Sequence, residues 1–275
     1  MTGSRLGELY RFDLAVAAEL VSADNFVVSG HLPDEGLRGT SPTGGDATTG
    51  GDTEHISAGP VIAGCDEAGR GALAGPACVA CVHLPVATGL VSTVNRLPSV
   101  LLSLCGVDDS KRLSPKKRED LFPKIIALAE IGIGWATPAE IDRIGIVPAL
   151  HNAARRAYLA LGVDADLVLL DRGLTLGRGD TETQAFSVSF PLRVSSPSFP
   201  RELAFTRGDA KSLHIAAASI IAKVSRDRLM VELDRRVPGY GLAQHKGYGT
   251  QAHRAAISRR GPSPIHRRSF VVRSV

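Results

Sequence analysis

The chain has 275 residues, a hydrophobic fraction of 44% and a formal net charge of +4. That length suits one large domain or two small ones, and the apolar fraction is ordinary for a protein with a buried core. The start lacks the pattern of a signal peptide and no run of about 18 apolar residues occurs, so we expect a cytoplasmic protein without a membrane span.

Basic residues are concentrated toward the C-terminus. Residues 201–275 hold 15 Lys and Arg against 5 Asp and Glu, whereas residues 1–200 hold 17 against 23. A basic C-terminal quarter indicates a polyanionic partner such as nucleic acid, although a solvated basic surface has the same composition. The phosphate-binding pattern G-x-x-x-x-G-K-[ST] is absent, which argues against a nucleoside triphosphatase.

The N-terminal part divides into a helix and a polar insert. Residues 5–22 have the pattern of a short amphipathic helix. Residues 33–59 are rich in Gly, Thr, Asp and Ser without an apolar period, so we expect a disordered insert. We therefore expect the ordered domain to begin near residue 59. The predicted domains are 1–58, 59–237 and 238–275.

The rest of the chain predicts strands first and then strands that alternate with helices. Strands are expected at 61–66, 77–84, 131–136, 167–170 and 186–194. Helices are expected at 114–130, 148–161, 212–237 and 250–260. Ser114 and Pro115 are typical of a helix start, whereas Pro123 should kink or interrupt that helix. This order predicts an α/β protein with helices on the faces of its sheet.

The cysteines do not form a metal-binding pattern. Cys78 and Cys81 lie three residues apart in a predicted strand and therefore face opposite sides of it. Neither Cys65 nor Cys105 completes a zinc pattern with them. We expect all four cysteines to be reduced and mostly buried, as is usual in a cytosolic protein.

The stretch 62–76, I-A-G-C-D-E-A-G-R-G-A-L-A-G-P, joins an apolar strand to the adjacent carboxylates Asp66 and Glu67. Inside a strand this pair would bury a charge, whereas at the strand end both side chains can reach a hard cation. Glycines at positions 69 and 71 let the backbone approach a ligand closely. A polar turn between two strands would account for the same residues.

Two further carboxylates occur at comparable places. Asp171 ends the apolar run 167–170, and Asp209 comes just before the long predicted helix. Taken singly, each is an ordinary residue at a turn or a helix entry. Together with Asp66 and Glu67 they form a candidate two-metal site, in which divalent ions about 3.5–4 Å apart act on a phosphodiester.

The segment G-C-D-E-A-G-R-G resembles the signature G-x-D-E-x-G-R-G of the type 2 ribonucleases H (ribonuclease HII). Further matches follow in the order of that family: Asp109-Ser110-Lys111, V-L-L-Asp171, Gly208-Asp209, I-A-A-A-S-I-I-A-Lys223 and His245-Lys246-Gly247-Tyr248-Gly249-Thr250. The resemblance runs from about residue 61 to the C-terminus. The chain departs from the family pattern after the third acid, where Arg172 replaces the usual Gly and a longer segment follows.

The resemblance implies a ribonuclease-H-like mixed sheet flanked by helices, with a smaller helical C-terminal part. Residues 59–237 would be the catalytic domain and 238–275 a substrate-binding extension. The implied catalytic residues and metal ligands, for two ions of Mg²⁺ or Mn²⁺, are Asp66, Glu67, Asp171 and Asp209.

The resemblance also implies substrate contacts. The backbone of Gly69-Arg70-Gly71 would touch the ribose 2′-hydroxyl, the group by which a protein distinguishes RNA from DNA. Tyr248 would stack on the sugar at the ribonucleotide–deoxyribonucleotide junction. The implied phosphate contacts, which position a nucleic acid without reading its sequence, are Ser110, Lys111, Lys223 and Lys246.

Several of these residues could instead have a purely structural role. Arg70 would also suit a surface turn, and Tyr248 a partly buried loop. The aliphatic part of Lys223 could instead cover apolar surface. Arg267 and Arg268 would extend the basic face.

The implied activity is that of an endoribonuclease. It would cut RNA paired with DNA, and also 5′ to single ribonucleotides in duplex DNA, leaving 5′-phosphate and 3′-hydroxyl ends. Its role would be the removal of ribonucleotides in DNA replication and repair. Its partners would be these nucleic acids, with no membrane partner, and the protein would be a monomer.

Two alternatives stay open. The sister type 3 enzyme generally has Lys where Arg70 stands, together with a folded N-terminal substrate-binding domain that residues 33–59 do not resemble. A nucleic-acid-binding module whose acids hold a structural ion would bind such substrates and not cut them.

Overall fold

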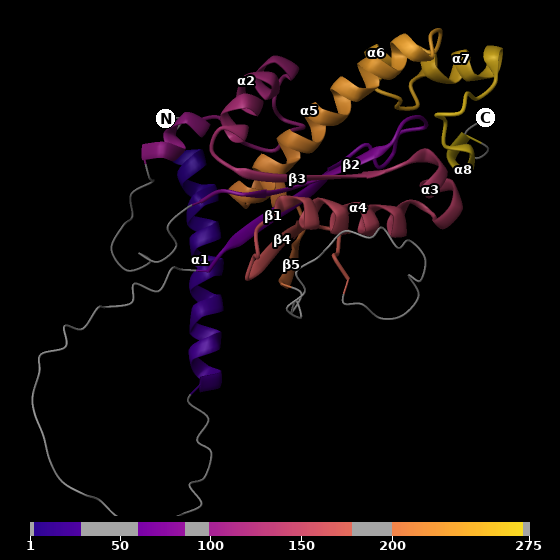
Figure 1. Cartoon of the computed structure of the whole chain (residues 1–275). Coiled ribbons are helices and arrows are strands. Elements are labelled where there is room, and N and C mark those ends of the chain that lie inside the picture. Colours follow the sequence, from indigo (N-terminus) through magenta and orange to yellow (C-terminus); the bar gives the residue numbers. More distant parts are fainter. Residues whose placement is uncertain (1–2, 29–59, 86–98, 178–199, 272–275) are drawn as a thin grey trace, which may run out of the picture.

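The computed structural model describes residues 3–28, 60–85, 99–177 and 200–271 (Figure 1). The predicted insert at 33–59 and the predicted strand at 186–194 lie outside these residues. None of the helices within the described ranges combines the length and apolar character that a membrane crossing requires.

The described residues contain a mixed five-stranded sheet in the order β3-β2-β1-β4-β5. Its strands are β1 (Ile62–Ala68), β2 (Ala77–His83), β3 (Glu130–Ala136), β4 (Leu167–Asp171) and β5 (Arg201–Phe205). β1, β2 and β3 pair antiparallel, whereas β4 and β5 run parallel to β1. The first four strands occur where the apolar runs predicted them. β5 was not predicted, because it is a short edge strand with mostly exposed side chains.

Helices cover both faces of the sheet, which confirms the predicted fold class. The long helix α5 (Leu213–Arg236) crosses β1 and β2 on one face, and α4 (Ile146–Leu161) packs on β2 and β3 on the other (Figure 1). Alternate side chains of β4 point to opposite faces of the sheet. Leu169 packs on the α5 side, whereas Val168 and Leu170 pack on the α4 side.

Glycines let these helices approach the sheet closely. A Cβ atom on Gly134 of β3 would lie 1.9 Å from the carbonyl oxygen of Ala153 in α4. A Cβ atom on Gly64 of β1 would lie 2.5 Å from the backbone of His214, in the first turn of α5. The beginning of α5 is therefore held directly over β1, close to its carboxylates.

Side-chain caps begin two of the other helices, and the first of them confirms a capping signal in the sequence. Ser114 accepts a hydrogen bond from the Lys117 N–H and caps α2 (Pro115–Ile126), which continues three residues past Pro123. Thr250 caps α7 (Gln251–Arg260) through the His253 N–H. Short elements that the sequence analysis did not assign are α3 (Pro138–Ile144), α6 (Leu242–His245), α8 (Arg268–Val271), η2 (Ser99–Leu104) and η3 (Gly208–Ala210).

The N-terminal helix α1 (Gly3–Val28) packs on the sheet domain. Leu6 and Leu9 are fully buried in the core cluster that also contains residues of α5. Asp13, only 3% exposed, accepts hydrogen bonds from the Leu213 and His214 N–H groups and caps α5. The predicted N-terminal helix therefore contributes to the core of the sheet domain, and the three domain boundaries stay a prediction.

Two of the cysteines form a disulfide, which corrects the expectation that all four are reduced. Cys65 of β1 and Cys81 of β2 are direct partners in the antiparallel ladder, and a disulfide joins them. Their sequence spacing did not indicate this, because the contact depends on the register of two strands. Cys78 and Cys105 are free, and burial raises the pKa of the Cys78 thiol to about 12.

Candidate active site

Three acidic side chains converge at the end of β4. Oxygen atoms of Asp66, Glu67 and Asp171 all lie within 4.8 Å of one another. β1 pairs with β4 only as far as Cys65, whereas its pairing with β2 continues to Ala68. Asp66 and Glu67 thus lie inside β1 and not at its end, which corrects the sequence analysis. They can still meet Asp171 because the neighbouring strand β4 stops beside them.

Burial gives this cluster an unusual electrostatic state. Asp66 is 2% exposed, and its Oδ1 accepts a hydrogen bond of 2.7 Å from the Glu67 N–H. Burial, followed by the charges of Glu67, Asp171 and Asp209, raises the pKa of Asp66 well above its usual value. A cation at this place would favour the charged carboxylate and remove the repulsion among the acids.

Asp209 lies beside the three clustered acids but outside the group that is within 4.8 Å. It is 3% exposed in η3, and the Asp171 Oδ1 accepts a hydrogen bond of 2.9 Å from the N–H of its neighbour Gly208. This bond ties the end of β4 to η3. Burial and the adjacent Asp109, opposed by Lys111, raise the pKa of Asp209 to about 6.

The oxygen atoms of this site fit a hard divalent cation. Glu67 Oε1 accepts a hydrogen bond of 2.7 Å from Arg70 Nε, whereas Glu67 Oε2 and Asp209 Oδ2 are buried and accept none from the described residues. Buried polar atoms without a partner are rare and costly. Carboxylate oxygens are also the ligands that Mg²⁺ and similar ions prefer. These carboxylate ligands therefore fit the divalent metal ion that the sequence predicted.

The predicted phosphate contact Lys111 lies at the edge of the acidic cluster. Its Nζ is 3.8 Å from Asp209 Oδ2, and its side chain is 77% exposed. Burial acts to lower the pKa of Lys111, but Asp66, Asp209, Asp109 and Asp171 together raise it. Lys111 therefore stays charged between the acids and solvent, where a phosphate can reach it.

Ser110 is placed differently from Lys111. It is 4% exposed, and its hydroxyl accepts a hydrogen bond of 2.6 Å from Ser219 of α5. The structure therefore buries this predicted phosphate contact, whose role stays a prediction. Asp109 belongs to the same motif, but the sequence analysis did not assign it to the site. Its position two residues before Lys111 could have indicated that it lies near the acids.

The Gly69-Arg70-Gly71 turn presents backbone. Gly69 has φ +90°, and a Cβ there would lie 1.9 Å from Arg226 Nε, so only glycine fits. A Cβ on Gly71 would meet nothing within 4 Å, which leaves that side of the turn open. The Arg70 guanidinium is engaged with Glu67 and the Gly173 carbonyl. The open part of the turn is thus its backbone.

The loop that carries Tyr248 lies against the segment after this turn. The Gly247 carbonyl accepts hydrogen bonds of 2.8 Å from the Leu73 N–H and 3.2 Å from the Ala74 N–H. The half-buried Tyr248 ring lies near two cations, at 5.6 Å from Lys223 Nζ and 5.3 Å from Arg226 Cζ. The fold therefore brings together the two predicted substrate contacts that lie far apart in the sequence.

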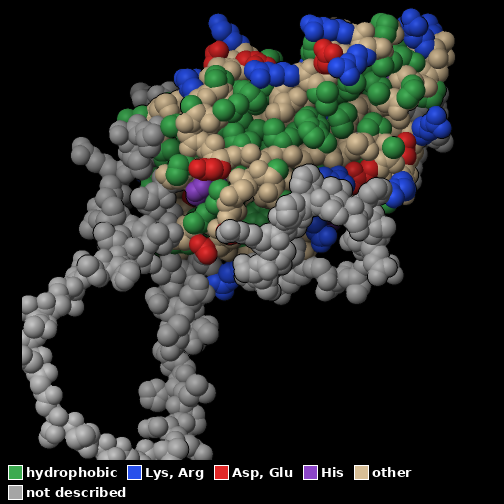
Figure 2. Space-filling view, viewed as in Figure 1, with side chains coloured by type: hydrophobic (Ala, Val, Ile, Leu, Met, Phe, Trp, Pro, Cys, Tyr) green, Lys and Arg blue, Asp and Glu red, His purple; other side chains and the backbone are tan. Residues whose placement is uncertain are grey.

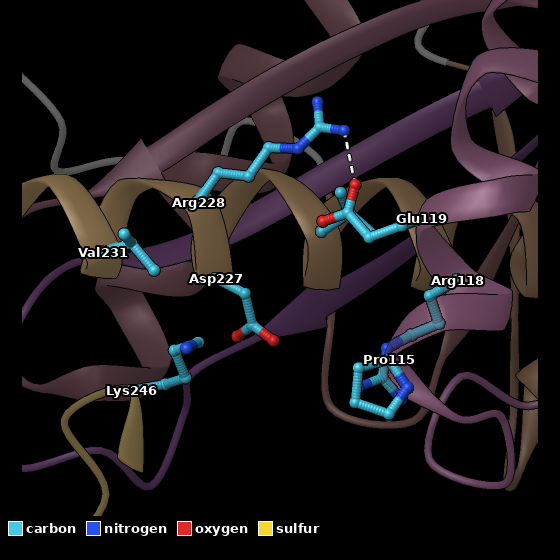
Figure 3. A pocket seen from close by; sticks show the side chains of 8 residues that line it. Pro115, Arg118, Glu119, Asp227, Arg228, Val231 and Lys246 are labelled. Carbon is cyan, nitrogen blue, oxygen red and sulfur yellow. Dashed lines mark hydrogen bonds and ion pairs between the residues drawn. The ribbon is translucent and has the colours of Figure 1, made fainter. Parts of the chain in front are cut away.

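Lys223 and Lys246 are both engaged within the protein. Lys223 Nζ forms an ion pair of 2.8 Å with Asp227, and Lys246 Nζ donates to the Ala243 carbonyl. Asp227 and Lys246 border a pocket of about 170 Å³ between α2 and α5 (Figure 3). The pocket is lined by Pro115, Arg118, Glu119, Val224, Asp227, Arg228, Val231 and Lys246. It contains none of the clustered acids, and the phosphate roles of both lysines stay predictions.

The basic surface has a defined place on the molecule. Figure 2 shows Lys and Arg side chains along the edge that carries α2 and the C-terminal helices. Arg268 is exposed, whereas Arg267 is fully buried and therefore does not belong to this surface, contrary to the sequence analysis. Composition could not separate these neighbours, because it does not show which arginine faces inward.

The comparisons with known proteins agree with this geometry. Residues 63–273 match the model of a family described as Ribonuclease HII. "Ribonuclease HII" of Geobacter sulfurreducens is 46% identical over 210 residues, covering 76% of this chain and 81% of that protein. "Ribonuclease HII" of Pelobacter propionicus is 47% identical over 211 residues, again covering 76% and 81%.

A solved structure supports the same assignment. The RNase HII chain in the PCNA:RNase HII complex from Archaeoglobus fulgidus is 25% identical with a TM-score of 0.54, covering 76% of this chain and 95% of that one. The family match spans both the acidic cluster and the two loops beside it. The chain therefore belongs to the ribonuclease HII family of endoribonucleases.

Proposed function

We propose that this endoribonuclease acts on RNA paired with DNA and cuts 5′ to single ribonucleotides embedded in duplex DNA. The observation that carries the proposal is the convergence of Asp66, Glu67 and Asp171 beside the open backbone of the Gly69-Arg70-Gly71 turn. The acids supply a metal site, and the turn supplies a contact for the 2′-hydroxyl. Such an activity serves ribonucleotide removal in DNA replication and repair.

The four acids Asp66, Glu67, Asp171 and Asp209 would hold two divalent ions, Mg²⁺ or Mn²⁺. When bound, such a pair activates a water as nucleophile and stabilises the leaving oxygen of the phosphodiester, giving 5′-phosphate and 3′-hydroxyl ends. Arg70 holds one oxygen of Glu67 and leaves the other for a ligand. Lys111 lies where it can bind the substrate phosphate next to the acids.

Recognition of the ribonucleotide would come from the two loops beside the acids. The 2′-hydroxyl can both donate and accept, so an open backbone turn is a suitable partner for it. The Tyr248 ring would stack on the sugar of the next nucleotide, and the basic edge in Figure 2 would contact phosphates. Cleavage would therefore depend on the presence of a 2′-hydroxyl and little on base sequence.

The test is cleavage of three duplexes that share one sequence: all-DNA, DNA with one ribonucleotide, and an RNA–DNA hybrid. We expect cutting of the second and third with Mg²⁺ or Mn²⁺, no cutting with EDTA, and a 5′-phosphate on the product. Asp209→Asn should abolish cutting, whereas Asp164→Asn, on an exposed residue, is the matched control. Binding of all substrates without metal-dependent cutting would contradict the proposal and favour a binding module.

Other observations distinguish the type 2 enzyme from the type 3 enzyme and bear on the oligomeric state. Arg70 stands where type 3 enzymes generally have lysine, and the matching family is ribonuclease HII, so the type 2 assignment is favoured. The Archaeoglobus fulgidus relative was solved together with PCNA. For this chain a monomer stays our prediction, and sedimentation equilibrium of the purified protein measures it.

A further inference from the structure

We propose that a short C-terminal segment positions both loops that contact the substrate. The segment consists of Ser263, His266 and Arg267, which we call the C-terminal brace. Arg267 holds the Gly69-Arg70-Gly71 turn, and His266 holds the Tyr248 loop through a second histidine. The inference rests on the proposed function, because it takes these two loops as the substrate contacts.

Arg267 is fully buried and makes its hydrogen bonds to backbone carbonyls. Its guanidinium donates to the Gly69 and Arg70 carbonyls at 2.8 Å each, and to the Gly75 carbonyl at 3.0 Å. No carboxylate forms an ion pair with it among the described residues. Burial, followed by Arg226, lowers the pKa of Arg267 to about 9. A buried cation is costly unless it is fully hydrogen-bonded, so its position is set by these carbonyls.

These bonds determine which way the turn presents its N–H groups. In a planar trans peptide the C=O and N–H groups point in opposite directions, and the described residues contain no cis peptide bond. Holding the Gly69 and Arg70 carbonyls toward Arg267 therefore turns the Arg70 and Gly71 N–H groups away from it. Neither N–H donates to a described residue, and the space beside Gly71 is open. Arg267 thus aims two free donors outward.

His266 reaches the Tyr248 loop through an ordered chain of hydrogen bonds. The Ser263 N–H donates to His266 Nδ1 at 3.0 Å, so the neutral ring carries its proton on Nε2. His266 Nε2 lies 3.1 Å from His253 Nε2, which must then accept. His253 Nδ1 therefore carries the other proton and donates to the Tyr248 carbonyl at 3.0 Å. One backbone N–H thus sets the tautomers of two rings.

The surroundings keep both rings neutral, as this chain requires. Both histidines are buried, and burial lowers the pKa of each, that of His253 to about 4. His245 stacks on His253 with ring centroids 4.2 Å apart, and Tyr240 packs on His266 at 4.7 Å. The Tyr248 carbonyl therefore keeps its donor at neutral pH.

The two halves of the brace act on one connected structure. His266 and Arg267 are neighbours in the chain, and the Arg267 N–H donates to the Leu73 carbonyl at 2.8 Å. The Gly247 carbonyl accepts from the Leu73 and Ala74 N–H groups. The turn and the Tyr248 loop are thus joined to each other and to the brace. Both are positioning contacts, since no brace residue needs to touch the substrate.

The Arg267 half is tested by binding without metal, where cleavage does not occur. The readout is the preference of the protein for DNA with one ribonucleotide over the same all-DNA duplex in EDTA. Arg267→Lys should reduce this preference by about fivefold or more, since one net hydrogen bond is worth roughly 1 kcal/mol. Arg156→Lys, at an exposed arginine of α4 that pairs with Glu140, should retain it. An unchanged preference in Arg267→Lys would overturn this half of the inference.

The His253 half is tested by two amide substitutions that mimic different ring nitrogens. His253→Asn places an amide near the position of Nδ1 and can still donate to the Tyr248 carbonyl, whereas His253→Gln places it near Nε2. We expect His253→Gln to lose about fivefold or more in kcat/KM at a single ribonucleotide, for the loss of one hydrogen bond. His253→Asn should restore most of that activity. Equal activity of the two variants would contradict a positioning role.

Controls separate loss of structure and failure of the proposed function from failure of the brace. Circular dichroism and thermal unfolding show whether each variant folds; if Arg267→Lys does not, the His253 pair decides the inference. A wild-type protein that cuts no ribonucleotide-containing substrate contradicts the proposed function. A wild-type protein that cuts and prefers the ribonucleotide, together with variants that do the same, contradicts the brace alone.

Discussion

At the scale of single residues, the candidate site contains more buried negative charge than the protein neutralises. Arg70 pairs with one oxygen of Glu67, and Lys111 lies 3.8 Å from Asp209. Among the described residues, nothing donates to Glu67 Oε2 or Asp209 Oδ2. The apoprotein therefore carries electrostatic repulsion that bound cations would relieve, so metal affinity and apoprotein stability should respond in opposite directions when one carboxylate is removed.

Asp171 offers the sharpest test of this relation, because the chain departs from the family pattern directly after it. Asp171→Asn should weaken Mn²⁺ binding by at least about tenfold, or about 1.4 kcal/mol, and abolish cleavage. The metal-free variant should melt at the same or a higher temperature than wild type. Titration calorimetry and thermal unfolding measure these effects, with Asp164→Asn as control. Wild-type Mn²⁺ affinity in Asp171→Asn would place the ligand elsewhere.

Tyr248 should act through its ring more than through its hydroxyl. Tyr248→Phe should be mild, whereas Tyr248→Ala should lose up to about 1 kcal/mol of stacking, the low end of the range for bases. The loss should be larger at a single ribonucleotide, which offers one cleavage register, than in a long hybrid, which offers many. Cleavage rates of both variants on both substrates at equal salt and Mg²⁺ decide this, and equal rates for Ala and Phe would remove the junction role.

His253 should make apoprotein stability depend on pH. Its folded pKa of about 4 is below the usual 6.5, so the unfolded chain binds more protons between these values. Its contribution to stability is therefore complete above about pH 6.5 and is lost as the pH falls toward 4. The wild-type melting temperature should drop more between pH 7 and pH 5 than that of His253→Asn. Parallel pH profiles would show that His253 does not titrate differently on folding.

At the scale of elements, the site depends on how closely helices approach the sheet. Gly64 lets the first turn of α5 lie on β1, and Asp13 of α1 caps that turn from the other side. On the opposite face, Gly132 and Gly134 let α4 lie directly on β3. Small residues at these crossings therefore let the helices lie close to β1 and β3, near the elements that carry the acids.

Gly134→Ala should destabilise the protein without altering the site directly. The new Cβ would lie 1.9 Å from the Ala153 carbonyl oxygen, so α4 must shift, at a cost of about 1–3 kcal/mol. Gly7→Ala in α1 is the control, because its Cβ meets its nearest atom at 3.7 Å, an ordinary contact. Chemical denaturation measures both variants. Equal stability of Gly134→Ala and wild type would mean that α4 can move away freely.

At the scale of the whole molecule, charge is separated between a buried acidic site and a basic edge. The edge carries α2 and the C-terminal helices, and Lys and Arg side chains line it (Figure 2). A nucleic acid bound along this edge would bring its backbone toward the acids through Lys111. Binding should therefore be electrostatic and largely independent of base sequence.

This arrangement predicts a salt-dependent affinity. Lys223→Ala and Lys246→Ala should each reduce the slope of log affinity against log salt by roughly 0.7–0.9, if each lysine leaves its internal partner for a phosphate. Arg156→Ala is the control, since it lies on α4, which covers the opposite face of the sheet from α5. Fluorescence anisotropy over a range of salt concentrations measures the slopes. A slope unchanged by either lysine would place that side chain off the binding surface.

The sequence alone determined the parts of this protein that depend on local chemistry. Apolar runs, the cap at Ser114, and the order of motifs predicted four strands, the long helix and the family. Asp66, Glu67 and Asp171 were singled out by their places after apolar runs, and the fold brings them together. Local patterns suffice there because strand period and capping involve residues that are close in the chain.

Tertiary structure decided what depends on contacts between distant segments. The Cys65–Cys81 disulfide follows from the register of β1 with β2, and the packing of α1 from a core shared with α5. The inward direction of Arg267 follows from carbonyls almost 200 residues earlier in the chain. No local pattern encodes these features, because each is set by which surfaces meet when the chain closes around its sheet.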